Sequence, residues 1–459
     1  MYNYKKLTLG IAPTRRDTFL LPEYAVANKK RMMERILSIC NGIHDLEVFT
    51  IDDICVDGLL VELEDVDRIA NYFADKKIDA LFIPHANFGQ EEAIAKLAKK
   101  MNLPVLLWGP RDGEPNSDMG FRKHDTQCGM FASSRALLRY GVPFTYIENC
   151  WLDSPILKRG IEDFIRVASI VKAFRNMRVL TLANRPRQFI SVKVNEGELL
   201  ERFGIEITPV TGSEWMAEVD RCLAEKEDEI DALVSDWEKR VNLCGTSKEN
   251  SRCMAAAELA VLSLAEKYSC NTVASECWET MINTKGFRSC FVHADLTEKG
   301  LSVSCECDVN GAVSSALCQA ATRGETPPFF ADITVRHPSN DNAELMWHCG
   351  PYPPSLARNQ QPDVLDCTCS FELKPGEITM MRFDGNRGVY NLFADIGVGV
   401  NGPKTSGSYV WLETKDWPAW EKKLMFGPYI HHIVGIYGNY KEIFKESCKY
   451  LGTEFDSVE

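Results

Sequence analysis

The stretch Leu301–Gly350, LSVSCECDVNGAVSSALCQAATRGETPPFFADITVRHPSNDNAELMWHCG, predicts a strand–helix–strand unit with acidic residues at the strand ends. Small apolar and acidic residues alternate in SCECD, as in a strand, and a period of two would place Glu306 and Asp308 on one face. VNGAVSSALCQAATRG has the composition of a helix that ends at Gly324. FFADITV then predicts a second strand, which carries Asp332.

These acids, together with His348 on a later strand, suit a divalent cation. Carboxylate oxygens with an occasional imidazole favour Mg²⁺ or Mn²⁺ over Zn²⁺. Acidic residues at strand ends also serve as solvated caps and turn formers. The local pattern leaves both interpretations open.

The composition is that of an ordinary globular protein, with 45% hydrophobic and 25% charged residues. A length of 459 residues exceeds what one core usually supports, so we expect two or three domains. The net charge of −13 and the lack of clustered Lys and Arg argue against a nucleic-acid partner. No secretory signal and no apolar span of ~20 residues is evident, so we expect a cytoplasmic protein without a membrane partner.

Seventeen cysteines are spread over strand-like and helix-like segments, which favours reduced, buried thiols over a disulfide framework. The pairs Cys305/Cys307 and Cys367/Cys369 lack the framework of a structural zinc site. On a strand, both members of each pair would share a face, which fits packing into a core.

Residues 1–175 alternate strand-like and helix-like segments, which predicts a doubly wound α/β domain of the Rossmann or flavodoxin-like kind. Ligands of such sheets bind at the carboxyl ends of the strands. No loop at these ends has the spacing of a phosphate-binding motif, so we expect no nucleotide cofactor. The residues at these ends either contact a sugar or an anionic group or simply cover the sheet: Arg15, Arg16, His85, Asn87, Trp108 and Arg111.

Residues 176–325 repeat the alternation and predict a second doubly wound α/β domain. Its charged segment, residues 213–242, is expected to form one long amphipathic helix with a solvated face. Glu276 follows a predicted strand and is either a substrate contact or a buried partner of Arg288.

From residue 326 to 459 short strands separated by Gly, Pro and Asn predict an antiparallel, barrel-like β-rich domain with a terminal helix. The neighbouring histidines His431 and His432 precede that helix. Neighbours on an extended segment point to opposite faces, so we expect at most one of them to reach a given site.

The motifs ECDVNGA, FFADITV, WHCGPYP and IHH together resemble the L-fucose isomerase and L-arabinose isomerase superfamily, and most closely the carboxy-terminal region of L-fucose isomerase. The resemblance implies two α/β domains followed by a β-rich domain. It also implies an aldose–ketose isomerase of carbohydrate metabolism that acts through an enediol with a divalent metal, usually Mn²⁺, with Mg²⁺ or Co²⁺ as alternatives. A homo-oligomer is implied too, commonly a hexamer in which the first domain of one subunit covers a neighbour's site.

By the same resemblance, the metal ligands fall on Glu306, Asp332 and His432, with His431 as the competing histidine. His348 resembles a ligand found in the arabinose isomerase branch only. Glu306 and Asp332 are then also the catalytic acid and base of proton transfer.

Asp308 begins the helix that follows Glu306, so we expect it to cap that helix or to support a ligand rather than bind metal. The chain is shorter than the fucose enzymes in its carboxy-terminal part, which leaves the sugar, neutral or anionic, undecided. Two other functions are compatible with the same architecture: a sugar-binding or regulatory protein without turnover, and a metal-dependent sugar epimerase.

Overall fold

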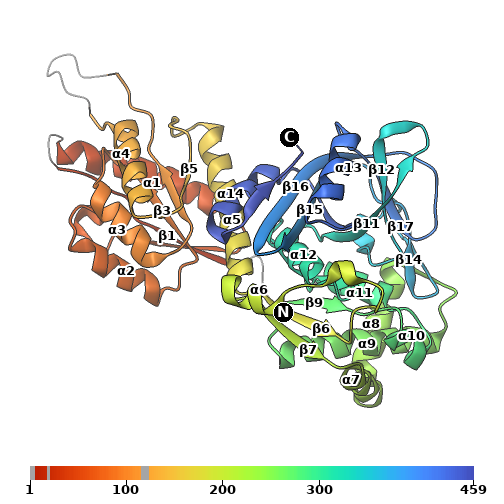
Figure 1. The fold of residues 1–459 in the computed structure, drawn as a ribbon. Helices are drawn as coiled ribbons and strands as arrows, with labels where there is room; N and C mark the ends of the chain where they lie inside the picture. Colours follow the sequence, from red (N-terminus) through yellow and green to blue (C-terminus); the bar gives the residue numbers. More distant parts are fainter. Residues whose placement is uncertain (1–5, 18–20, 115–122, 459) are drawn as a thin grey trace. The chain divides into compact units, whose positions relative to one another are not determined.

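The computed structural model describes residues 6–17, 21–114 and 123–458, and Figure 1 shows the fold. The chain divides into two compact units, one within residues 5–172 and the other within residues 173–459. No helix of the described residues combines the length and apolar character needed to cross a membrane.

The first unit is built on a five-stranded parallel sheet with strand order β2-β1-β3-β4-β5. Its strands are β1 (Leu7–Ile11), β2 (Leu46–Thr50), β3 (Ala80–Pro84), β4 (Val105–Trp108) and β5 (Thr145–Tyr146). The helices that follow the strands are α1 (Pro22–Cys40), α2 (Asp65–Asp75), α3 (Glu91–Met101), α4 (Thr126–Arg139) and α5 (Pro155–Arg175), with a 3₁₀ turn at Val56–Gly58.

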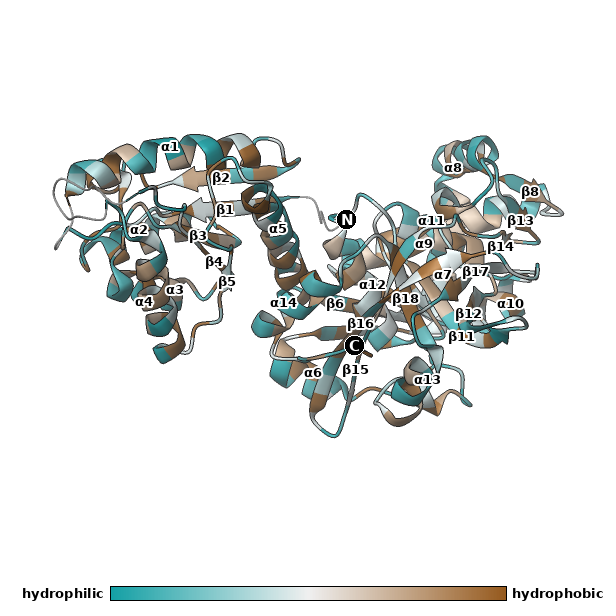
Figure 2. Cartoon of the chain, turned by 90° about the horizontal axis from the view of Figure 1, so that it is seen from above, coloured by the Kyte–Doolittle hydropathy of each residue, from teal (hydrophilic) through white to brown (hydrophobic). Residues whose placement is uncertain are grey.

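These helices are amphipathic: α2, for example, buries Val66, Ile69 and Phe73 and leaves Asp67 and Arg68 exposed. Outer helices such as α1 carry hydrophilic and hydrophobic stretches side by side (Figure 2). The predicted alternation of strands and helices around a parallel sheet is thus confirmed.

The second unit begins with a four-stranded parallel sheet of order β10-β9-β6-β7. Its strands are β6 (Arg178–Leu182), β7 (Glu206–Val210), β9 (Thr272–Ser275) and β10 (Val303–Cys305). Its helices are α6 (Glu196–Phe203), α7 (Gly212–Glu225), α8 (Glu227–Arg240), α9 (Lys248–Lys267), α10 (Thr280–Lys285), α11 (Cys290–Glu298) and α12 (Val309–Ala321), with a 3₁₀ turn at Ile190–Val192.

The single long helix expected over residues 213–242 was wrong, because the chain leaves helical geometry at Lys226 (φ −119°, ψ 41°) between α7 and α8. The break lets each short helix turn its own apolar residue inward. Trp215 of α7 and Trp237 of α8 are both buried in the core.

The carboxy-terminal part forms a closed antiparallel barrel of order β15-β18-β11-β12-β17-β16, in which β16 pairs back with β15. Its strands are β11 (Phe329–His337), β12 (Asn340–His348), β15 (Glu377–Asn386), β16 (Val389–Val400), β17 (Ser408–Glu413) and β18 (His432–Tyr437). The predicted barrel is confirmed.

Several short elements surround the barrel. Strand β19 (Glu454–Asp456) joins β16 in parallel, and β8 (Asn242–Cys244), β13 (Asp363–Leu365) and β14 (Thr368–Ser370) make a separate three-stranded sheet. The remaining elements are α13 (Trp417–Phe426), α14 (Lys441–Leu451) and a 3₁₀ turn at Pro354–Leu356.

Helix α12 joins the parallel sheet to the barrel, since it contacts β9 and β10 as well as β15 and β18. All of its residues are buried, and its sequence VNGAVSSALCQAA is rich in small side chains that permit close approach. One hydrophobic cluster includes Val273 of β9, Phe329 of β11 and Met380 of β15. The regions predicted as second and third domains therefore share a core within one unit.

A methyl group added at Gly435 tests this packing. Gly435 of β18 lies opposite Phe329 of β11, and a Cβ there would come 2.1 Å from Phe329 Cζ. We expect Gly435→Ala to lower the thermal unfolding midpoint by an amount equivalent to ~1–3 kcal/mol of overpacking, measured by circular dichroism. Gly197→Ala, where the nearest atom lies at 3.7 Å, should leave the midpoint unchanged or raise it slightly. Equal midpoints for Gly435→Ala and the unmodified protein would contradict this account.

Candidate active site

Glu306 lies in the short turn that connects β10 to α12. Strand β10 ends at Cys305, and both Glu306 (φ 61°) and Cys307 (φ 52°) take the left-handed conformation, which costs energy for residues other than glycine. The expectation that Glu306 and Asp308 share one face of a strand was therefore wrong. The turn directs the buried Glu306 carboxylate toward the barrel residue His432, and its Oε1 accepts a hydrogen bond from Trp278 Nε1 at 3.2 Å.

Asp308 is the N-cap of α12 and is completely buried. Its Oδ1 accepts a hydrogen bond from the Gly311 N–H at 2.9 Å, and both of its oxygens accept from the guanidinium of Arg382 on β15. Burial alone would raise the pKa of Asp308, but the charge of Arg382 and the bond to His432 hold it far below its ordinary value. The predicted capping role is confirmed, and the carboxylate stays ionised.

His432 begins β18 and is held from one side by Asp308, whose Oδ2 lies 2.9 Å from Nδ1. The other ring nitrogen, Nε2, lies 2.9 Å from Glu306 Oε2 and 3.5 Å from Asp332 Oδ1. Because the ionised Asp308 can only accept, Nδ1 carries a proton, and Nε2 is the nitrogen that faces the two acids. Burial lowers the pKa of His432, but the contacts with Asp308 and Glu306 raise it to about 9, so that Nε2 is also protonated at neutral pH until a cation takes the place of its proton.

Asp332 lies directly opposite His432, because strands β11 and β18 pair in antiparallel register. The expectation that at most one of the neighbouring histidines reaches the site was wrong, because the rings of His431 and His432 lie side by side with their centres 4.3 Å apart. Asp332, His431 and His432 offer ligand atoms that all lie within 4.8 Å of one another, so both histidines approach this acid. His431 is the more peripheral of the two, with a side chain 44% exposed.

His348 ends β12, and its Nε2 lies 4.0 Å from Asp332 Oδ1. Its Nδ1 accepts a hydrogen bond from the Cys349 N–H at 2.9 Å, so the neutral ring carries its proton on Nε2. His348 thus points an N–H, rather than a lone pair, at the acid.

Four buried atoms at this point make no hydrogen bond within the described residues: Glu306 Oε2, Asp332 Oδ1, His348 Nε2 and His432 Nε2. The 2.9 Å contact between His432 Nε2 and Glu306 Oε2 is an ion pair without hydrogen-bond alignment. Buried polar atoms are rarely left unsatisfied, and two carboxylates with an imidazole lone pair match the preferences of Mn²⁺ or Mg²⁺. The donor set fits a divalent cation.

A cavity of about 410 Å³ opens beside these residues. Glu306, Asp332 and His348 line it together with three aromatic side chains and one exposed arginine, Arg288. Apolar walls with a few convergent polar groups are typical of small-molecule sites. The aromatic side chains are Phe189, Trp278 and Trp347.

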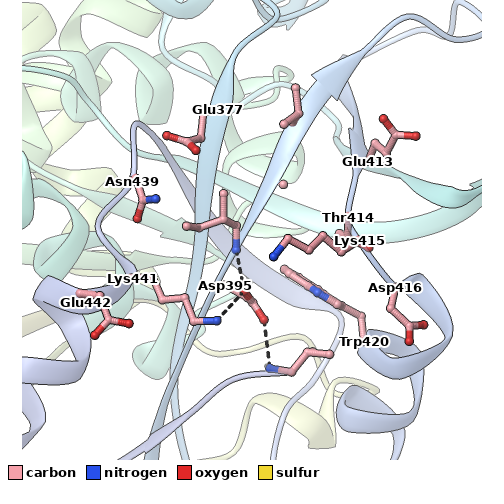
Figure 3. Close-up of a pocket in the computed structure, with 14 residues that line it drawn as sticks. Glu377, Asp395, Glu413, Thr414, Lys415, Asp416, Trp420, Asn439, Lys441 and Glu442 are labelled. Atoms are coloured by element: carbon pink, nitrogen blue, oxygen red, sulfur yellow. Dashed lines mark hydrogen bonds and ion pairs between the residues drawn. The ribbon is translucent and has the colours of Figure 1, made fainter.

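A larger cavity of about 540 Å³ is lined by residues of β15, β16 and β17 and of the segments that follow β17 and β18, and it contains several acids (Figure 3). Its central carboxylate, Asp395, already accepts hydrogen bonds from Lys441 Nζ at 3.0 Å and from the N–H groups of Ile396 and Val458 at 2.9 Å each. Asp395 is thus already engaged, and none of the described residues that line this cavity is a histidine. The smaller cavity beside Glu306 is therefore the candidate active site.

The substrate-binding residues predicted at the first sheet belong to the unit of residues 5–172, and most of their polar groups already bond to neighbours within that unit. Arg15 forms ion pairs with Asp17 at 2.7 Å and Asp57 at 2.6 Å. The Asn87 amide bonds to the main-chain N–H and C=O of Arg16, each at 2.8 Å. Asn87 thus shapes the loop that carries Arg16.

The remaining candidates of that sheet are His85, Trp108 and Arg111. His85 is buried with Nδ1 3.0 Å from the Phe88 carbonyl, and Trp108 belongs to the core. Arg111 has its guanidinium 5.5 Å from the Trp151 ring centre.

Glu276 caps the turn after β9, where its oxygens accept from the N–H groups of Trp278, Glu279 and Thr280. It supports the segment that carries Trp278, while Arg288 lines the cavity.

Sequence reasoning missed Arg382, although an arginine among the apolar residues of MMRF is a signal of a buried ion pair.

Known proteins resemble this chain over most of its length. Residues 10–175 match the family described as fucose/sulfoquinovose isomerase, N-terminal domain. A sulfoquinovose isomerase from Priestia aryabhattai is 23% identical over 97% of this chain and 98% of its own length. Another from Alkalicoccus urumqiensis is 25% identical over 71% of this chain and 73% of its own length. These similarities confirm the resemblance predicted from the carboxy-terminal motifs: the chain is similar to sulfoquinovose isomerases, and residues 10–175 match the amino-terminal domain of fucose and sulfoquinovose isomerases.

Proposed function

We propose that this chain is a divalent-metal-dependent aldose–ketose isomerase that acts on a sugar through an enediol. The observation that carries the proposal is the convergence of unsatisfied acid oxygens and imidazole nitrogens at one cavity. The full-length relatives support the reaction class.

Glu306, Asp332 and the Nε2 lone pair of His432 would hold the ion, with His431 at the edge of the same group. When bound, a divalent cation such as Mn²⁺ stabilises negative charge that develops on sugar oxygens. Asp308 orients His432 and keeps its Nε2 free, in the way that carboxylates support metal-binding histidines. His348 presents an N–H that a sugar oxygen can accept.

Proton transfer needs acids whose charge and position are fixed. The nearby histidines hold the pKa of Glu306 below its ordinary value although burial alone would raise it, so the carboxylate is ionised and able to take a proton. Trp278 holds Oε1 in place. We assign Glu306 and Asp332 to the two proton transfers of the isomerisation, between the carbons and between the oxygens.

The sugar itself is proposed to carry an anionic group, as sulfoquinovose does through its sulfonate. Arg288 supports this proposal because its exposed guanidinium lines the cavity that contains Glu306 and Asp332. A guanidinium offers paired donors that suit a planar or tetrahedral anion. Sulfoquinovose is therefore the first substrate to test.

Removal of either acid should abolish turnover. We expect Glu306→Gln and Asp332→Asn to lower kcat for ketose formation from sulfoquinovose by ~10²- to 10⁴-fold, because each loses a proton-transfer group. Glu377→Gln, which changes an acid of the larger cavity, should retain full activity. The rate of ketose formation is measured by chromatography. Near-normal turnover by Glu306→Gln would refute the assignment of Glu306 as a proton-transfer group.

Asp308 should act on metal affinity through His432. We expect Asp308→Asn, which can still cap α12 but loses its charge toward both His432 and Arg382, to weaken Mn²⁺ binding by roughly 10- to 100-fold in calorimetric titrations of the folded variant. Asp416→Asn provides the matched control, since Asp416 also caps a helix, α13, without contacting His432. An unchanged Mn²⁺ affinity in Asp308→Asn would show that His432 needs no support from this carboxylate.

Arg288 should determine the preference for a charged sugar. Loss of a charge-assisted hydrogen bond predicts a KM for sulfoquinovose roughly 10- to 100-fold higher in Arg288→Gln, with the KM for a neutral aldose little changed. Arg358→Gln, an exposed arginine paired with Glu372, serves as control. If both sugars lose affinity equally, Arg288 is not the anion contact.

A further inference from the structure

Two cysteines from distant parts of the chain meet at the wall of the candidate cavity. Cys290 is the first residue of α11, and Cys349 directly follows β12. Their sulfur atoms lie 3.5 Å apart, although the residues are 59 positions apart in sequence. A disulfide requires about 2.05 Å between sulfurs, so closure needs a movement of only ~1.5 Å.

Both cysteines belong to the wall of the cavity. Cys290 and Cys349 line it together with Glu306 and His348. Cys349 is partly exposed, whereas Cys290 is only 1% exposed. An oxidant that enters the cavity therefore meets Cys349 first, with Cys290 behind it as a partner.

Cys349 is also tied to the catalytic machinery through His348. Its N–H donates to His348 Nδ1 at 2.9 Å, and its sulfur lies 3.3 Å from the same nitrogen. The next residue, Gly350 (φ 146°), packs so closely on the Cys369 main chain that a Cβ there would lie 2.7 Å from the Cys369 nitrogen. Because Gly350 is held on one side, a shift of Cys349 toward Cys290 is transmitted to His348.

We propose that Cys290 and Cys349 form a reversible disulfide under peroxide and that this bond inactivates the enzyme. Hydrogen peroxide oxidises the Cys349 thiol to a sulfenic acid, and its O–O bond is cleaved with release of one water. The Cys290 thiol then attacks the Cys349 sulfur, so that the S–S bond forms and a second water leaves. Two thiols thus lose two electrons and two protons in total, and a dithiol such as dithiothreitol restores them.

The covalent part of this proposal is tested without any substrate. The Mn²⁺-supplemented protein is treated with stoichiometric peroxide, then alkylated, digested and analysed by mass spectrometry. We expect a cross-linked peptide pair that contains Cys290 and Cys349 and disappears after dithiothreitol. In Cys290→Ser the sulfenic acid on Cys349 should instead be trapped by dimedone, because its resolving thiol is gone. Absence of the cross-linked pair in the unmodified protein would overturn the proposal.

The functional part rests on the proposed isomerase activity and is measured separately. Peroxide should lower ketose formation at least tenfold in the unmodified protein, with recovery after dithiothreitol. Cys290→Ser and Cys349→Ser should show no recoverable loss, whereas Cys244→Ser, which removes an exposed thiol, should respond like the unmodified protein. A cross-link that leaves activity unchanged would overturn the inactivation. Failure of the untreated protein to act on sugars would instead count against the proposed function, whatever the thiols do.

Discussion

The buried ion pair between Asp308 and Arg382 is the interaction on which the candidate site depends. Asp308 starts the helix that follows the parallel sheet, Arg382 lies on barrel strand β15, and neither side chain is more than 1% exposed. Such a pair is costly to break, because the buried Arg382 would then keep only its second partner, Asp384, at 2.8 Å. It binds the amino terminus of α12 to the barrel and keeps the charge of Asp308 in place beside His432.

The rest of the site follows from that arrangement. With Asp308 bonded to Nδ1, His432 turns its Nε2 toward Glu306 and Asp332. Antiparallel register places Asp332 opposite His432, while the left-handed turn at Glu306 brings the third group from the sheet. Three separate parts of the chain thus converge within one unit, and the local strain at Glu306 is held by the surrounding core.

Much of this organisation could be predicted from the sequence. Alternating strands and helices gave the parallel sheets, short strands with Gly and Pro gave the barrel, and the motifs around Glu306, Asp332 and His432 pointed to residues that the structure brings together. The failures have local causes. Two consecutive left-handed residues cannot be read from SCECD, and the close approach of the His431 and His432 rings cannot be read from IHH.

Other features depend on tertiary contacts that no local pattern contains. The helix break at Lys226 follows from the need to bury Trp215 and Trp237 separately, and the role of Arg382 needs its partner 74 positions away. The approach of Cys290 to Cys349 is of the same kind. Periodicity locates elements, but contacts between distant elements decide which of their polar groups meet.

Locating a bound metal ion tests the proposed site of Glu306, Asp332 and His432 most directly. A crystal structure of the protein with Mn²⁺, with anomalous scattering used to place the ion, should show one site bound by Glu306, Asp332 and His432 Nε2, with Asp308 hydrogen-bonded to Nδ1 and not bound to the ion. An ion found only in the larger cavity near Asp395, or one bound directly by Asp308, would contradict the account.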